Sequence, residues 1–252
     1  MTAKPASPGP VSRLGMLTPS SNTVLEPLTC AMAADMPDVT THFSRFRVTQ
    51  IGLSAEALGQ FDNESLLAAA DLLADARVDV IAWNGTSAAW LGFERDEELC
   101  ATITARTGIP ACTCILAYRE LFETWGLRKI GLVTPYSGDV QDRIMTNWDT
   151  DGFSCSAERH LGGGRDNFAF AEVTEDQIAG MVRDVAAAGC DAAAIVCTNL
   201  KGSAIAPALE RELGIPVLDS ISVTLWKSLV LAGRDPSALA AWGGPFKDIR
   251  KN

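Results

Sequence analysis

The sequence predicts an α/β protein built from two related halves, each a parallel sheet flanked by helices. Three observations support this: short apolar runs alternate with longer amphipathic ones, glycines follow several of the amphipathic runs, and the chain repeats part of its own sequence. Alternation of strands and helices is typical of parallel sheets, because each crossover helix covers one face of the sheet.

Strands are expected where apolar residues form short uninterrupted runs, because a strand buried on both faces lacks in/out alternation. These runs cover residues 12–17, 40–48, 78–83, 129–134, 190–196 and 215–218. Helices are expected between them, where apolar residues recur at helical spacing. The predicted helices cover residues 54–76, 94–107, 115–125, 138–149, 175–188, 205–213 and 223–231. Several end at a glycine, such as Gly108 or Gly214, which readily adopts the left-handed conformation of a helix end.

Three segments of the chain recur in the same order further along the sequence. Residues 14–21 (LGMLTPSS) resemble residues 130–137 (IGLVTPYS), and residues 79–86 (DVIAWNGT) resemble residues 191–198 (DAAAIVCT). The Gly-Ile-Pro sequence at residues 108–110 returns at 214–216. The repeat predicts two pseudo-two-fold-related, Rossmann-like halves with the active site in the cleft between them.

The repeat also suggests how the chain is divided. The first half is expected over residues 11–115 and the second over residues 116–216. Residues 217–252 are expected to pack back onto the first half. Residues 1–10 include three prolines and are interpreted as a flexible leader.

Polar residues follow the predicted strands at the ends where α/β folds bind ligands. The expected substrate-binding residues are Ser20, Ser21, Asn22, Gly85, Thr86, Ser87, Tyr136, Thr198 and Asn199. Backbone N–H groups at such turns suit a carboxylate. The sequence therefore predicts a site for a small organic anion. Turn formation and helix capping are the alternative roles for Asn22 and Tyr136.

Composition argues against several function classes. The chain has 21 Lys and Arg against 31 Asp and Glu, a formal net charge of −10, which disfavours nucleic acid and anionic membrane surfaces as partners. Seven scattered cysteines without paired CxxC motifs predict reduced thiols in a cytoplasmic protein. Neither a membrane span, a metal site around His42 or His160, nor a nucleotide site at glycines 162–164 is expected.

Cys197 is the predicted catalytic residue, at the end of a predicted strand. A thiol with a pKa near 8.5 is mostly protonated at neutral pH, so it can donate a proton without activation. In the repeat, Cys197 corresponds to Gly85, which offers no second proton carrier. Protonation from one side is favoured. The alternative is a buried structural thiol.

The segment at residues 18–26 (TPSSNTVLE), the Thr134-Pro135-Tyr136 turn, Asn167 and Cys197 resemble the aspartate/glutamate racemase superfamily, specifically its maleate cis-trans isomerase and arylmalonate decarboxylase branch. The likeness extends over residues 13–231. It implies catalysis without metal or organic cofactor and adds Asn167 to the substrate-binding residues, although a flexible lid at Asn167 is an equal alternative.

The resemblance leaves the reaction open. The isomerases carry a second cysteine where this chain has Gly85, whereas the decarboxylases have Gly-Thr-Ser there and one cysteine that protonates an enediolate. The decarboxylases, however, have Pro-Pro in place of residues 20–21 and Gly-Gly in place of residues 198–199. The leading expectation is a malonate-type decarboxylase in which Asn22, Tyr136, Thr86 and Ser87 hold one carboxylate and Trp83, Trp90 or Leu200 faces the other. A maleate isomerase or racemase, and a non-catalytic carboxylate-binding protein, are the alternatives. A homo-oligomer is possible.

Overall fold

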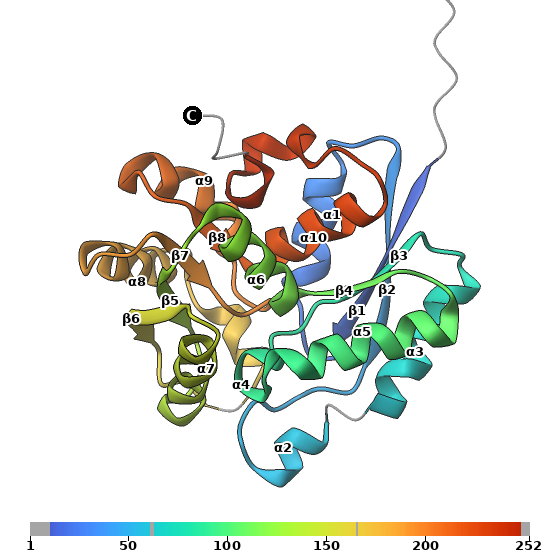
Figure 1. Cartoon of the computed structure of the whole chain (residues 1–252), viewed down its shortest axis with the longest axis horizontal. Coiled ribbons are helices and arrows are strands. Elements are labelled where there is room, and N and C mark those ends of the chain that lie inside the picture. Colours follow the sequence, from blue (N-terminus) through green and yellow to red (C-terminus); the bar gives the residue numbers. More distant parts are fainter. Residues whose placement is uncertain (1–10, 61–62, 165, 248–252) are drawn as a thin grey trace, which may run out of the picture.

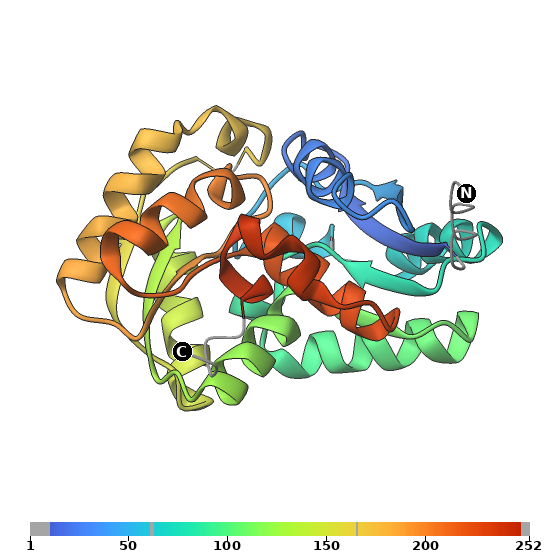
Figure 2. The same cartoon turned by 90° about the horizontal axis from the view of Figure 1, so that it is seen from above.

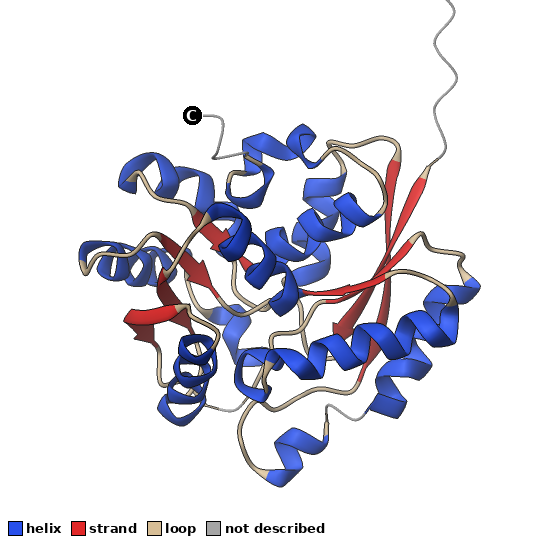
Figure 3. Cartoon of the chain, viewed as in Figure 1, coloured by secondary structure: helices blue, strands red, loops and turns tan. Residues whose placement is uncertain are grey.

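The computed structural model describes residues 11–60, 63–164 and 166–247. The predicted leader, residues 1–10, lies outside these described residues. Two separate parallel sheets, coloured red in Figure 3, form the framework, and helices cover them. Among the described residues, no helix is long and apolar enough to cross a bilayer.

The two sheets have the same strand order. The first contains, side by side, β2 (Val39–Phe46), β1 (Ser12–Pro19), β3 (Val80–Trp83) and β4 (Ala111–Thr113). The second contains β6 (Ser154–His160), β5 (Lys129–Thr134), β7 (Ala192–Ile195) and β8 (Val217–Asp219). Figure 1 shows the first sheet in blue and green and the second in yellow and orange.

The strand registers match the internal repeat. Leu17 pairs with Trp83 in the first sheet, and the repeat-related Val133 pairs with Ile195 in the second. All pairings within the two sheets are parallel. The predicted α/β fold class, with two halves that each contain a parallel sheet, is confirmed.

Helices connect the strands in both halves. The first part of the chain forms α1 (Leu25–Ala33), α2 (Ala55–Gly59), α3 (Asn63–Asp75), α4 (Ala88–Leu91), α5 (Phe93–Thr107) and α6 (Cys114–Trp125). The second part forms α7 (Gly138–Thr150), α8 (Glu175–Ala187), α9 (Gly202–Leu213) and α10 (Ser220–Leu231). Short 3₁₀ turns lie at Phe168–Glu172, Pro236–Trp242 and Gly244–Phe246.

The prediction was wrong for several elements. The single helix expected over residues 54–76 is two helices, α2 and α3, with residues 61–62 between them outside the described part. The strands β4 and β6 and the helices α1 and α4 were missed. β4 and α4 are too short to show a period, β6 is a polar edge strand, and α1 contains Pro27, which is tolerated in a first turn.

The C-terminal segment packs against the first sheet. Ile221, Leu225 and Leu229 of α10, with Phe246 beyond it, share a buried cluster with Met16 of β1. In Figures 1 and 2, α10 lies beside α1 and α6, and it contacts both helices. Because α10 also contacts α9 and β8, the segment bridges the two halves.

Close packing explains why the repeat has a glycine at equivalent positions of β1 and β5, namely Gly15 and Gly131. A Cβ at Gly15 would lie 2.9 Å from Cγ2 of Val78, and one at Gly131 would lie 2.8 Å from Cγ2 of Val185. Real Cβ atoms essentially never approach so closely. Both glycines therefore allow close packing against the central strand of each sheet.

We expect Gly15→Ala and Gly131→Ala each to lower the free energy of unfolding by about 1–3 kcal/mol, because the added methyl group overpacks a closed core. Gly180→Ala is the control, since nothing lies within 4 Å of its Cβ position inside α8. That change should raise the stability by about 0.5–1 kcal/mol through helix propensity. Urea unfolding measures all three, and equal effects would contradict this packing argument.

Candidate active site

The carboxyl ends of β3 and β7 meet at a cavity of about 20 Å³ between the two sheets. It is lined by Pro19, Val48, Ile51, Trp83, Gly85, Thr86, Ser87, Trp90, Tyr136, Asn167, Cys197 and Thr198. All of these lining residues, taken from the described part of the chain, are uncharged. A cavity of this size has room for about one water-sized molecule, so an organic ligand requires the walls to open.

Cys197 lies just beyond the end of β7, with only 2% of its surface exposed. The backbone N–H of Asn199 donates to its sulfur at 3.4 Å, and the Tyr136 hydroxyl is hydrogen-bonded to the same sulfur. Burial raises the pKa of the Cys197 thiol to about 12, which outweighs the lowering by these hydrogen bonds. The sulfur is therefore a protonated thiol at neutral pH.

Tyr136 and Thr86 bring hydrogen-bonding groups from the two halves together. Their hydroxyl oxygens lie 2.6 Å apart. The Tyr136 ring packs edge-on against Trp90 and Phe170, with ring centroids 5.4 and 5.7 Å apart respectively. Burial raises the pKa of Tyr136 well above its ordinary value, so its hydroxyl remains protonated.

The turn at residues 85–87 supplies further donors to the cavity wall. The backbone N–H groups of Gly85, Thr86 and Ser87 form no hydrogen bond to another described residue. Unpaired N–H groups beside an enclosed cavity are suited to hold an anion. The site can thus bind a carboxylate with neutral donors, despite the net negative charge of the chain.

Asn167 joins the cavity to the first half of the chain. Its Nδ2 donates to Oγ of Ser21 at 2.8 Å, and its backbone N–H donates to the carbonyl of Thr49 at 3.0 Å. An antiparallel bridge between Gln50 and Asp166 extends the contact. Asn167 is buried and lines the cavity. It therefore contributes both to the cavity wall and to the contact between the two halves.

Asn22, Thr198 and Asn199 form a buried network between the strand ends. Asn22 Nδ2 donates to Oγ1 of Thr198 at 3.1 Å, and Thr198 in turn donates to the carbonyl of Asn84 at 3.1 Å. Asn199 Oδ1 accepts from the backbone N–H of Thr23 at 3.0 Å, and its Nδ2 donates to the carbonyl of Asn167 at 2.6 Å. The first three of these bonds cross from one half to the other, and the last joins two segments of the second half.

The structure thus separates the predicted site residues into two groups. Gly85, Thr86, Ser87, Tyr136, Asn167, Cys197 and Thr198 line the cavity. Ser20, Ser21, Asn22 and Asn199 do not, because their side chains bind the protein itself. Asn22 Oδ1 also accepts from the N–H groups of Val24 and Leu25 at the start of α1, which is the capping role considered from the sequence.

Three wall residues, Pro19, Val48 and Ile51, were missed from the sequence. Pro19 belongs to the repeated Thr-Pro pair and could have been found, whereas Val48 and Ile51 carry no local signal. Trp83 and Trp90 line the cavity as expected, but Leu200 does not.

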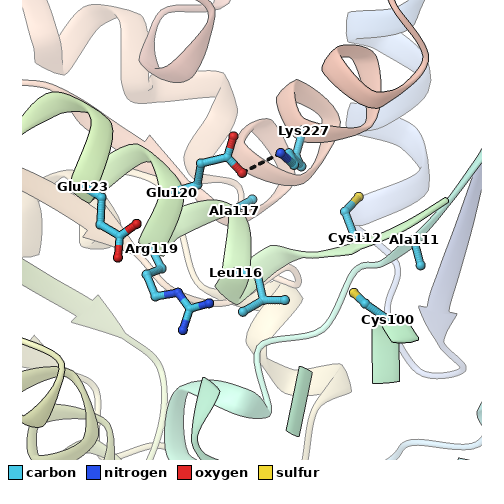
Figure 4. Close-up of a pocket in the computed structure, with 9 residues that line it drawn as sticks. All are labelled: Cys100, Ala111, Cys112, Leu116, Ala117, Arg119, Glu120, Glu123 and Lys227. Carbon is cyan, nitrogen blue, oxygen red and sulfur yellow. Dashed lines mark ion pairs between the residues drawn. The ribbon is translucent and has the colours of Figure 1, made fainter. Parts of the chain in front are cut away.

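A larger cavity, of about 300 Å³, opens elsewhere between α5, α6 and α10 (Figure 4). Cys100 and Cys112 line it, beside an ion pair of 2.5 Å between Lys227 and Glu120. Its cationic groups are accompanied by carboxylates, so it offers no convergent set of donors. Within the described residues, no group of three or more His, Cys, Asp or Glu could hold a metal ion.

We expect alkylation of Cys197 by iodoacetamide to accelerate about tenfold per pH unit from pH 7 to 9.5, because only the thiolate reacts and its pKa lies higher. Peptide mass spectrometry measures the rate, with the exposed Cys30 in the same sample as reference. A plateau below pH 8 would show a stabilised thiolate and contradict the protonated thiol.

Asn199→Ala is expected to lower the free energy of unfolding by about 2–4 kcal/mol, because it leaves buried partners in both halves without a hydrogen bond, at a cost of about 1–3 kcal/mol each. The side chain of the half-buried Asn147 donates from Nδ2 to the carbonyl of Ala89 at 3.1 Å, so Asn147→Ala should lower the free energy of unfolding by about 1 kcal/mol. Urea unfolding measures the free energy of unfolding of both variants, and an equal decrease in the two would contradict the structural role of the Asn199 network.

Comparison with known proteins gives relatives over nearly the whole chain. A maleate isomerase from Geobacillus stearothermophilus is 27% identical over 228 residues, covering 86% of this chain and 90% of the relative. An arylmalonate decarboxylase from Bordetella bronchiseptica is 26% identical over 241 residues, covering 93% and 96%. The resemblance to this branch of the aspartate/glutamate racemase superfamily is confirmed.

The fold is shared with solved structures. A Nocardia farcinica maleate cis-trans isomerase carrying a covalently bound succinylcysteine intermediate matches with a TM-score of 0.82, at 22% identity, over 90% of this chain and 95% of that one. The family profile described as arylmalonate decarboxylase matches residues 22–243. The chain therefore belongs to the arylmalonate decarboxylase family.

Proposed function

We propose that this protein is a decarboxylase of small malonate-type dicarboxylic acids in which Cys197 donates the proton. The observation that carries the proposal is the asymmetry of the cavity: a protonated thiol on the β7 side, and a glycine, Gly85, at the equivalent place on the β3 side. A mechanism that needs a proton carrier on each face of the substrate has only one such sulfur here.

The neutral donors of the cavity would stabilise the charge that develops during reaction. One carboxylate of the substrate would accept hydrogen bonds from Thr86, Ser87 and Tyr136 and from the N–H groups at residues 85–87. When carbon dioxide leaves, this carboxylate becomes an enediolate with more negative charge on its oxygens. Loss of one donor aimed at such an oxyanion costs about 10²–10³ in rate.

The departing carboxylate would lie against the apolar part of the wall. The side chains of Val48 and Ile51 offer no hydrogen bond to an anion there. A carboxylate in such poor solvation is destabilised, while neutral carbon dioxide is not. The wall therefore favours loss of carbon dioxide.

Atoms and charges balance without a further reactant. The carbon–carbon bond breaks, its electron pair enters the enediolate, and carbon dioxide departs. The S–H bond of Cys197 then breaks as the α-carbon takes the proton, which gives the monocarboxylate and a thiolate. Because burial strongly disfavours the thiolate, Cys197 would recover a proton from solvent once the product leaves.

Maleate isomerisation is the second candidate, favoured by the identity to maleate isomerases and by the Ser-Ser-Asn and Thr-Asn sequences at residues 20–22 and 198–199. It would require the Cys197 sulfur to attack an alkene as a thiolate. The raised pKa of this thiol and the uncharged cavity wall oppose thiolate formation.

Cys197→Ala should reduce carbon dioxide release from malonic acids by about 10²–10⁴-fold, the usual contribution of a general acid. Cys155→Ala is the matched control, because that buried thiol lies in β6 away from the cavity. In deuterated water the product should carry one new deuterium at the α-carbon.

The same assay separates the candidates. Maleate consumed without carbon dioxide release, followed by ultraviolet absorbance, would establish the isomerase instead. Decarboxylation that survives Cys197→Ala within a few-fold would remove the proposed role of this thiol.

A further inference from the structure

Trp83 occupies the space above Gly85. An ideal Cβ built on Gly85 would lie 1.9 Å from Cζ2 of Trp83 and 2.2 Å from its Cε2, well inside van der Waals contact. The indole is only 1% exposed and is braced by Phe46, with ring centroids 5.1 Å apart. Any side chain at position 85 therefore has to displace a large buried ring.

The indole of Trp83 forms cavity wall on the β3 side, where no side chain corresponds to the Cys197 thiol. In the repeat, Trp83 corresponds to Ile195 and Gly85 to Cys197, so the two strand ends present different groups to one cavity. The β7 side presents a sulfur with a transferable proton. The β3 side presents an aromatic ring over a residue without a side chain.

Trp83 also separates the cavity from a second, smaller one. This space, of about 30 Å³, is lined by Leu66, Trp83, Ser87, Leu91, Arg95, Asp96 and Leu99. Trp83 and Ser87 line both spaces, whereas Cys197 lines only the first and Asp96 only the second. Trp83 and Ser87 therefore lie in the wall between the thiol and the carboxyl group.

Asp96 is a buried titratable group behind that wall. Its side chain is buried, and Oδ2 has no hydrogen-bond partner in the described structure. Burial raises the pKa of Asp96 to about 7, so its carboxyl group can exchange a proton near neutral pH. The ring of Trp83 thus occupies the place that a side chain at 85 would take, and it lies in the wall that separates the cavity from the space lined by Asp96.

The geometry points to Trp83 as the residue that determines stereospecificity, by closing one face of the bound acid to proton transfer. This inference rests on the proposed decarboxylation. Protonation then comes from Cys197 only, and a malonic acid with two different α-substituents gives a single enantiomer. Gly85 and Trp83 therefore form a steric pair, because the ring occupies the space that a side chain at 85 would need. A thiol at position 85 can transfer protons to the substrate only when Trp83 is replaced by a smaller residue.

The test compares Gly85→Cys, Trp83→Leu, and the double variant Trp83→Leu/Gly85→Cys in the full-length protein. The enantiomer ratio of the product is measured, together with racemisation of the isolated product in deuterated water. Racemisation needs one carrier to remove the α-proton and another to return one to the opposite face. Trp148→Leu is the control for loss of a buried indole, since Trp148 packs on Phe122 and does not line the cavity.

We expect Gly85→Cys to lose thermal stability and to give one enantiomer. The double variant should regain stability relative to Gly85→Cys and racemise the product at least about tenfold faster than the parent, as an added acid–base group allows. Trp83→Leu should lower the enantiomer ratio, and Trp148→Leu should leave it unchanged. The inference is overturned if Gly85→Cys is as stable as the parent and racemises the product, or if Trp83→Leu keeps the parental ratio.

A readout without turnover keeps this inference distinct from the proposed function. Iodoacetamide labelling of the sulfur introduced by Gly85→Cys should be at least about tenfold faster relative to Cys30 after Trp83→Leu is added, because the ring no longer covers it. Equal labelling in the single and double variants would overturn the steric pair. If the parent releases no carbon dioxide, the proposed function fails, while the labelling result still decides whether Trp83 covers position 85.

Discussion

The site depends on a buried hydrogen-bond network that holds the carboxyl ends of two parallel sheets together. Asn22, Thr198 and Asn199 contribute amide and hydroxyl groups rather than charges, and each of them forms a hydrogen bond to the opposite half of the chain. A buried ion pair would carry a large desolvation cost and would place a strong field beside the reacting groups. Neutral amide and hydroxyl groups join the halves instead, so the network adds no charge beside the cavity.

This neutrality sets the chemistry of Cys197. With no cation lining the cavity among the described residues, burial dominates and the thiol retains its proton. The hydrogen-bond donors around it are therefore suited to stabilise an anion that forms on the substrate. A thiol of this kind is better suited to protonate an enediolate than to attack carbon.

The two halves preserve what packing requires and differ where chemistry is carried out. Gly15 and Gly131 remain equivalent because each lies beneath a packed side chain that leaves no room for a Cβ. At the strand ends, Gly85 corresponds to Cys197, and Trp83 to Ile195. Two similar sheets thereby enclose a cavity with unlike faces, which an enzyme acting on one face of a planar intermediate requires.

The sequence by itself determined the fold class, the duplication and the contrast between Cys197 and Gly85, because periodicity and repetition are local properties of the chain. Only the tertiary structure decided which polar side chains face the cavity. Ser20, Ser21, Asn22 and Asn199 looked like substrate ligands, but packing brings their side chains against segments 27 to 176 residues away in the chain, and they form hydrogen bonds to the protein there. The covering of Gly85 by Trp83 was likewise invisible in the sequence, because the direction of a side chain at a strand end depends on its neighbours in space.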